Sequence, residues 1–236
     1  MAAGMGGQAG WHYLTTADIF PLRRIVFSGQ QKVSEATLRA LLPVSLGDNL
    51  LRLNLHQLGE RLKMHPWIKR AVLFRRLPDT LVIRVEERTP FALIHTGEAW
   101  LIDEEGYILA APARNRENRY PHIQGLRHQA YAPGDRVTEP GLQVGLFLLK
   151  TFRHSPLFPG LMVTAIDVRS PQSPLLVWGD HQLTLRVGLD DLRGKLSLLP
   201  LITAYMARKG QEIAFIDLSL SRKIVVKPAL VTVARE

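Results

Sequence analysis

The 236-residue chain contains no cysteine, which excludes disulfide cross-links and thiol chemistry. It also has no glycine-rich phosphate loop, no recognised zinc-ligand spacing and no nucleophile elbow around a serine. No apolar run is long enough to cross a bilayer or to serve as a secretory signal. Because these are the motifs by which enzymes, metal centres and cofactor sites are recognised, we expect a protein without catalytic activity, metal or cofactor.

Residues capable of metal binding or acid–base chemistry are scattered along the chain. Of the eight histidines, only His122 and His128 lie close in sequence, in a polar segment that we expect to be a solvated loop. Residues 103–106 (Asp-Glu-Glu-Gly) fall short of a calcium loop because Arg114 occupies the twelfth position. The Glu86-Glu87 pair is better explained as surface charge on a strand, and the Asp190-Asp191 pair as a helix cap, than as a general acid and base of an active site.

The chain is strongly basic, with a formal net charge of +9 and a sequence pI of about 10.2. Such a charge is typical of proteins that bind nucleic acid or an anionic membrane. The Arg and Lys residues are, however, spread through the predicted strands and helices, without an Arg-rich run or an aromatic platform. We therefore expect most of this charge to be a solvated surface, and we expect no nucleic-acid partner.

Residues 20–90 show the clearest local pattern. Alternating apolar and polar residues predict a strand over 22–29. Ser34 is placed to cap a helix that Pro43 ends, and Asn54 to cap a second helix that Pro66 ends. The apolar period then changes to two on both sides of residues 77–80 (Leu-Pro-Asp-Thr), which predicts a hairpin. The sequence thus predicts a βααββ unit.

The motifs inside this unit are more informative than its periodicity. They comprise residues 25–29 (Ile-Val-Phe-Ser-Gly), 47–51, 58–62, 65–68 (His-Pro-Trp-Ile) and 77–90, which begins Leu-Pro-Asp-Thr-Leu. In this order and spacing they resemble a POTRA domain, and more narrowly the POTRA domain of the bacterial cell-division family FtsQ/DivIB. The resemblance continues less sharply to about Pro228.

Beyond Pro90, short apolar runs broken by turns predict mostly β structure. Strands are expected at residues 91–95, 99–103, 107–110, 161–169, 175–178, 182–187, 212–220 and 222–226. One helix is expected to begin at Glu139-Pro140 and a second to span residues 191–209, where Pro200 should kink or split it. The predicted fold class is α+β, a βααββ POTRA domain followed by a mostly antiparallel β domain with two helices.

The predicted domain organisation has four parts. Residues 1–19 are a flexible juxtamembrane segment or an added tag, residues 20–90 the POTRA domain, residues 91–228 an FtsQ-type β domain and residues 229–236 a C-terminal tail. The resemblance implies a single N-terminal transmembrane helix before Phe20, which this chain does not include. It places the protein in the cell inner membrane as a single-pass protein, with this region periplasmic at the division septum.

The same resemblance implies a function in protein–protein interaction. It implies a non-enzymatic scaffold that binds FtsB, itself paired with FtsL, by adding a strand to its terminal strand, and that links these partners to septal peptidoglycan synthesis. FtsK, FtsW, FtsI and FtsN are further candidate partners. The expected contact residues are Leu220, Ser221, Arg222, Lys223, Ile224, Val225 and Val226, with Arg169 as a charge contact.

Both predicted docking edges have a simpler interpretation. Residues 220–226 are also consistent with an ordinary closing strand that is paired internally or covered by the tail. The first strand of the POTRA hairpin is a second candidate edge, although its mixed charges would also serve to discourage aggregation. The residues of this second edge are Lys69, Arg70, Val72, Phe74 and Arg76.

Two other functions compete with the division scaffold. The first is a POTRA-containing docking or chaperone module of outer-membrane assembly or secretion, which would be expected to have several POTRA repeats or a following barrel of alternating strands. The sequence shows one POTRA pattern, and two predicted helices interrupt the remainder. The second is a basic nucleic-acid-binding protein, which a salt-dependent DNA shift would reveal.

Overall fold

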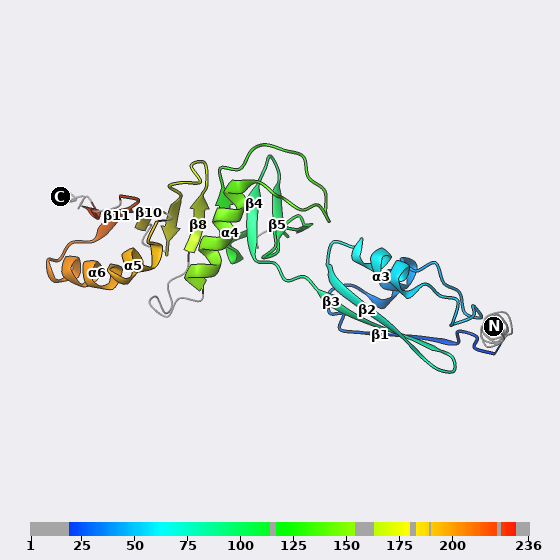
Figure 1. Ribbon diagram of the computed structural model, residues 1–236. Helices are drawn as coiled ribbons and strands as arrows, with labels where there is room; N and C mark the ends of the chain where they lie inside the picture. The colour runs from blue at the N-terminus through cyan, green and yellow to red at the C-terminus, as the bar shows by residue number, and fades with distance from the viewer. Residues whose placement is uncertain are drawn as a thin grey trace, which may run out of the picture. The chain divides into compact units, whose positions relative to one another are not determined.

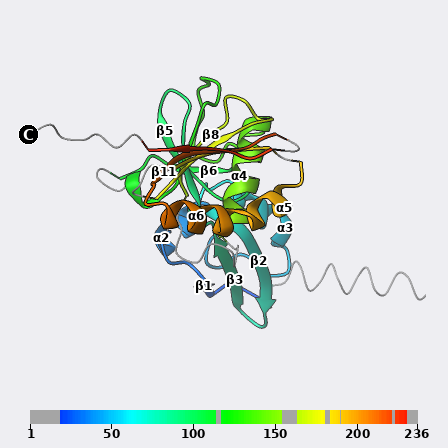
Figure 2. The ribbon, with the colours of Figure 1, turned by 90° about the vertical axis from the view of Figure 1, so that its left-hand side faces the viewer.

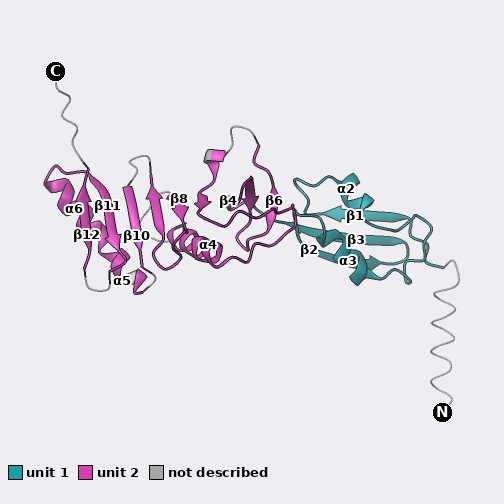
Figure 3. Ribbon diagram, turned by 90° about the horizontal axis from the view of Figure 1, so that it is seen from above, with its two compact units in different colours: residues 1–89 teal, residues 90–236 magenta. Residues whose placement is uncertain are grey.

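The computed structural model describes residues 19–113, 117–153, 163–179, 183–188, 190–220 and 223–229. It divides the chain into two compact units, residues 1–89 and 90–236, which Figure 3 shows in different colours. Each unit has its own hydrophobic core. Among the helices in the described residues, none is both long and apolar enough to cross a bilayer.

The first unit has the predicted βααββ order, visible in Figure 1. Its elements are β1 (Arg24–Ser28), α2 (Glu35–Ala40), α3 (Leu55–Lys63), β2 (Ile68–Arg76) and β3 (Thr80–Glu87). The sheet order is β1-β3-β2, with β1 parallel and β2 antiparallel to the central β3. Strand β2 is therefore one edge of this sheet.

The helices of this unit begin where the sequence predicts. The Ser34 hydroxyl accepts a hydrogen bond from the Thr37 N–H at 3.1 Å, and the Asn54 side chain accepts one from the Gln57 N–H at 3.1 Å. The buried faces of both helices pack on the sheet through a core that includes Leu38, Leu58, Leu62, Ile25, Phe27, Leu81, Ile83 and Val85. The core thus follows the periodicities of the sequence.

The second unit is built on one long sheet. Its described strands are β4 (Ala92–His95), β5 (Ala99–Ile102), β6 (Ile108–Ala110), β7 (His122–Gln124), β8 (Val163–Asp167), β9 (Leu175–Trp178), β10 (Leu183–Val187), β11 (Ile213–Leu218) and β12 (Val225–Pro228). Within the described residues these nine strands form one sheet in the order β12-β11-β10-β9-β8-β7-β4-β5-β6. Strands β12 and β6 are its two edges.

The helices of the second unit connect parallel strands. Helix α4 (Pro140–Arg153) lies between β7 and β8 in the chain, and the pair α5 (Leu192–Ser197) and α6 (Leu199–Arg208) lies between β10 and β11. Both strand pairs are parallel, as is the pair β4–β7, whereas the other neighbours are antiparallel. The predicted mostly antiparallel α+β fold is confirmed. The predicted split at Pro200 also occurs, since Pro200 lies in the first turn of α6.

The terminal strand differs from its predicted position. Strand β12 begins at Val225, three residues after the predicted start at Arg222, and Pro228 lies inside it instead of just beyond it. Ser221 and Arg222 lie outside the described residues. A proline is tolerated in a strand where its missing N–H would face away from the neighbouring strand, and Pro228 occupies such an edge position.

Candidate functional site

The first candidate site is the outer edge of β12. Among the described residues, β12 pairs only with β11, antiparallel, in the register Asp217↔Val225, Ile216↔Val226 and Phe215↔Lys227, with a bulge between Ile213 and Phe215. The opposite flank of β12 has no neighbour in the part of the chain that the structure describes. This edge is visible beside β11 in Figure 3. Such an edge is a template for an added strand.

The direction of the backbone groups along β12 follows from one hydrogen bond. The Ala229 N–H donates to the Glu212 carbonyl oxygen of the β11 side at 2.8 Å. The N–H and C=O groups of successive strand residues face opposite flanks. Since Ala229 faces β11, Lys227 and Val225 also face β11, and the backbone groups of Val226 face outward. Pro228 also faces outward but has no N–H to donate. The free donor of the described strand is therefore Val226.

The two faces of β12 have different chemistry. Ile224 and Val226 pack against the hydrophobic core, on the same face as their neighbour Ile216. Val225 and Lys227 project from the opposite face, where the Lys227 ammonium lies 5.6 Å from the centre of the Phe215 ring. An added strand would therefore meet an apolar face on one side and a mixed cationic and aromatic face on the other.

A short hydrogen-bonded turn fixes the exit from β11. The Asp217 carboxylate accepts hydrogen bonds from the Ser219 N–H at 2.8 Å and hydroxyl at 2.6 Å, and it lies 3.4 Å from the Arg186 guanidinium. Burial opposes ionisation of Asp217, but the two Ser219 bonds and Arg186 outweigh it and hold the Asp217 pKa below its ordinary value. The following residue, Leu220, is exposed. This turn positions the start of the segment that leads to β12.

Arg169 lies apart from β12. It follows β8, and its guanidinium makes a two-point ion pair with Asp167, with Nε 2.8 Å from Oδ2. Burial opposes ionisation of Asp167, yet the Arg169 bonds lower the Asp167 pKa. Four strand spacings of about 4.8 Å separate β8 from β12, which is roughly 19 Å. The structure therefore does not bring Arg169 together with β12, and the Arg169 side chain, although 77% exposed, already has an acidic partner.

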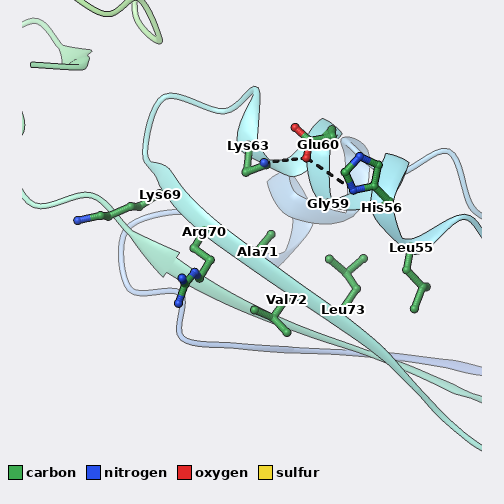
Figure 4. A pocket seen from close by; sticks show the side chains of 10 residues that line it. All are labelled: Leu55, His56, Gly59, Glu60, Lys63, Lys69, Arg70, Ala71, Val72 and Leu73. Carbon is green, nitrogen blue, oxygen red and sulfur yellow. Dashed lines mark ion pairs between the residues drawn. The ribbon is translucent and has the colours of Figure 1, made fainter. Parts of the chain in front are cut away.

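The second candidate site is the free flank of β2. Among the described residues β2 pairs only with β3, and a groove of about 440 Å³ runs between β2 and α3 (Figure 4). The groove includes Lys69, Arg70 and Val72 of the predicted edge, whereas Phe74 and Arg76 do not line it. Phe74 instead packs under the Arg84 guanidinium, 5.4 Å from the ring centre. The full lining is Leu55, His56, Gly59, Glu60, Lys63, Lys69, Arg70, Ala71, Val72 and Leu73.

The α3 wall of this groove has its own charge pairing. Figure 4 shows Glu60 between Lys63, at 2.7 Å, and His56, at 4.0 Å. The hydrogen bond from Lys63 lowers the Glu60 pKa. Gly59 faces β2, and a β-carbon there would lie 3.5 Å from the Leu73 Cδ1 atom. This is an ordinary van der Waals distance, so the space between α3 and β2 at this point would also accommodate an alanine.

The histidines are arranged differently from the prediction. His122 lies in β7 rather than in a loop, and its neighbour is His95 of β4, with ring centres 5.4 Å apart and His95 Nε2 3.3 Å from His122 Nδ1. The prediction failed because the parallel β4–β7 pairing joins residues distant in sequence. Burial, followed by the neighbouring His122, lowers the His95 pKa. Across the described ranges, no three His, Cys, Asp or Glu side chains are grouped to hold a metal ion.

Comparison with known proteins agrees with this architecture. Residues 20–88 match the family model for the POTRA domain of FtsQ type, and residues 92–219 match the model for the C-terminal region of cell division protein FtsQ/DivIB. Cell division protein FtsQ of Anaeromyxobacter sp. (strain K) is 29% identical over 223 residues, covering 94% of this chain and 76% of that protein. Cell division protein FtsQ of Syntrophotalea carbinolica is 27% identical over 214 residues, covering 91% and 76%. The chain belongs to the FtsQ/DivIB family of cell-division proteins.

Proposed function

We propose that this protein is a non-catalytic scaffold of the division machinery that binds an extended segment of FtsB, paired with FtsL, by adding its strand to β12. Through these partners it would be linked to septal peptidoglycan synthesis. The observation that supports the proposal is the outer flank of β12, which no described strand covers. Main-chain hydrogen bonds to this flank would supply affinity, and the side chains on its two faces would select the partner.

The proposed contact segment combines the predicted residues with the observed strand. Val226 offers an outward N–H and C=O, and Ile224, two residues earlier, would present its backbone groups to the same flank. Lys223 precedes it and adds an exposed cationic side chain. Leu220 adds an exposed apolar side chain after the Asp217–Ser219 turn. Arg169 is dropped from this contact set because it lies about four strands away and is paired with Asp167.

We propose the β2 edge of the first unit as a separate docking surface. Its unpaired flank lies beside the α3 groove, and Arg70 and Val72 are exposed there. A peptide added to this edge could place side chains over the groove. We also propose that the intact protein is held in the inner membrane by a single preceding span, with both units in the periplasm, where other division proteins such as FtsK, FtsW, FtsI and FtsN are candidate ligands.

The strand-addition proposal is tested by two substitutions at one position. Val226→Pro removes the outward N–H and places a ring on the free flank, while the bonds between β12 and β11 remain. Val226→Ala removes comparable apolar packing but keeps the N–H, so it is the matched control. Binding of the purified chain to the periplasmic parts of FtsB and FtsL, measured by isothermal titration calorimetry, is expected to weaken at least about tenfold with Val226→Pro and less than about threefold with Val226→Ala.

Thermal unfolding of both variants separates loss of binding from loss of fold. Their melting temperatures are expected to agree within a few degrees, because neither loses a bond to β11. Val225→Pro is a contrasting variant, since its N–H faces β11 and its loss would destabilise the second unit. Equal FtsB–FtsL affinity of Val226→Pro and Val226→Ala would refute strand addition at β12.

A further inference from the structure

Three segments of the chain meet at one end of the first unit. On one flank, the Leu22 N–H donates to the Asp48 carbonyl oxygen and the Gly47 N–H donates to the Leu22 carbonyl oxygen, both at 2.8 Å. On the other flank, the Arg23 N–H donates to the carbonyl oxygen of Asp79, in the loop between β2 and β3, also at 2.8 Å. Figures 1 and 2 show this loop projecting from the unit. We call this end, formed by residues 19–24, 45–52 and 76–80, the hairpin end.

The hairpin end exposes three large apolar side chains. Ile19, Leu46 and Leu77 are 42%, 61% and 55% exposed. Leu46 and Leu77 belong to turns on opposite flanks of residues 20–23, so two strand spacings of about 4.8 Å, roughly 10 Å in all, separate these turns. Ile19 directly precedes the segment between them. Apolar side chains on neighbouring turns can enter the interface of a bilayer together.

The charges at the hairpin end are mostly positive. The described titratable side chains there are four arginines and two aspartates, namely Arg23, Arg24, Arg52, Arg76, Asp48 and Asp79. Asp79 is paired with Arg24 at 3.5 Å, and the Asp48 carboxylate accepts the Ser45 N–H at 2.8 Å. Asp18 lies outside the described residues. The described charges amount to +2, which is complementary to anionic lipid headgroups.

We infer that the hairpin end docks on the surface of an anionic bilayer, with Leu46 and Leu77 in the headgroup region and the neighbouring arginines on lipid phosphates. The inference rests on the proposed membrane span, which would precede this unit and lead into it at the hairpin end. A lipid surface fits better than an added strand, because residues 22 and 23 already have hydrogen-bonded neighbours on both flanks. The inference goes beyond the two proposed docking edges, neither of which involves lipid.

The first test places a fluorescent probe at the hairpin end. Because the chain has no cysteine, Leu77→Cys can be labelled at that position alone with an environment-sensitive dye. Its emission is expected to shift to shorter wavelength with vesicles of phosphatidylethanolamine and phosphatidylglycerol, and to stay unchanged with phosphatidylcholine vesicles. Met64→Cys is the matched control, since Met64 is 77% exposed and lies between α3 and the opposite end of β2. Equal shifts at the two positions would overturn the inference.

The second test separates the hairpin end from the overall charge of the chain. An arginine near an anionic surface strengthens binding about fivefold, so Arg23→Gln/Arg76→Gln is expected to weaken vesicle co-sedimentation at least about tenfold. Arg61→Gln/Arg70→Gln removes the same charge from exposed positions toward the opposite end of the unit, and it should weaken binding less than about threefold. Equal losses in the two variants would overturn the inference. Displacement of the chain from vesicles by soluble glycerol phosphate would also overturn it, because the site would then bind a free phosphate.

Further controls separate this inference from the proposed function. Vesicle binding is measured on this chain, so failure of the proposed span would leave the result unchanged. Val226→Pro should not alter vesicle binding, and Arg23→Gln/Arg76→Gln should not alter the affinity for FtsB and FtsL. Leu46→Ser/Leu77→Ser should weaken vesicle binding while circular dichroism shows an unchanged fold. If this variant instead lost only self-association, the hairpin end would contact a second copy and the inference would be wrong.

Discussion

The Glu87 carboxylate closes the loop that precedes α2, and replacing it with Gln should destabilise the first unit. Its Oε1 atom accepts hydrogen bonds from the Val33 and Gln31 N–H groups at 2.9 and 3.0 Å, and Oε2 accepts from Lys32 at 2.9 Å. Glutamine keeps one acceptor oxygen but presents an NH₂ group to the remaining N–H. At least one charge-assisted bond is therefore lost, and the others are weakened.

The size of the effect follows from these contacts. A hydrogen bond to a charged group contributes about 1.5–3 kcal/mol, and partial exposure of Glu87 favours the lower end. We expect Glu87→Gln to reduce the unfolding free energy of the first unit by about 2 kcal/mol at pH 7. Glu86→Gln, at the exposed neighbouring position, should change it by less than about 0.5 kcal/mol.

The destabilisation caused by Glu87→Gln should depend on pH through the ionisation of the Glu87 carboxylate. Burial opposes ionisation of Glu87, but the N–H groups of Val33, Gln31 and Lys32 prevail and lower its pKa. A lowered pKa means that the stabilisation is present above the unfolded-state value, about 4.3, and is lost as pH falls through the folded-state pKa. The difference between wild type and Glu87→Gln should therefore shrink at acidic pH.

Hydrogen exchange in increasing urea, followed by mass spectrometry, measures each unit separately within the intact chain. Peptides from β3 should report the loss in Glu87→Gln, and peptides from β9 and β10 should report none. A destabilisation that stayed constant between pH 7 and pH 3 would refute the assignment to the ionised carboxylate. So would equal stability of the Glu87→Gln and Glu86→Gln chains at pH 7.

Two further substitutions test how the first unit is held together. Arg75→Met should reduce the free energy of unfolding, measured in urea, by about 2–4 kcal/mol. The Arg75 guanidinium donates hydrogen bonds to carbonyl oxygens in the Leu50–Leu53 segment at 2.6–3.4 Å, and loss of these bonds would leave partly buried acceptors unpaired. Gly29→Ala should reduce the free energy of unfolding by more than about 3 kcal/mol, because the new β-carbon would lie 2.1 Å from the Val85 carbonyl oxygen. Gly47→Ala, which is also at positive φ but in open space, should reduce it by about 1 kcal/mol. Equal melting temperatures of the two alanine variants would contradict the steric argument.

The elements of the first unit could be predicted because each follows from local chemistry. Ser34 and Asn54 form the expected caps, and the hairpin strands alternate as their residues do. The role of Arg75 could not be predicted, since its carbonyl partners lie more than 20 residues earlier in the chain. Long-range pairings of this kind depend on how elements pack, which the local pattern does not contain.

In the second unit, strands are easier to predict than their pairing. The helices α4 and α5–α6 each connect parallel neighbours, although the sequence pattern predicts only a mostly antiparallel sheet with interrupting helices. A helix between two strands is the usual requirement for a parallel pair, so the sequence does contain this signal. The same kind of parallel pairing places His122 beside His95, which no local pattern indicates.

The sequence does not indicate which flank of the terminal strand is unpaired. The number of backbone groups on that flank limits the affinity for an added strand. On the outer flank of β12, Val226 offers a donor and an acceptor and Pro228 offers only an acceptor, because successive residues alternate between flanks. With one further pair at Ile224, an added strand would form on the order of four to five bonds, worth roughly 2–7 kcal/mol in total. Micromolar affinity requires about 8 kcal/mol, so backbone pairing to this short edge is insufficient without side-chain contacts. The proline thus keeps the edge too short for promiscuous pairing, and a partner is selected by what it places against the apolar and cationic faces of β12.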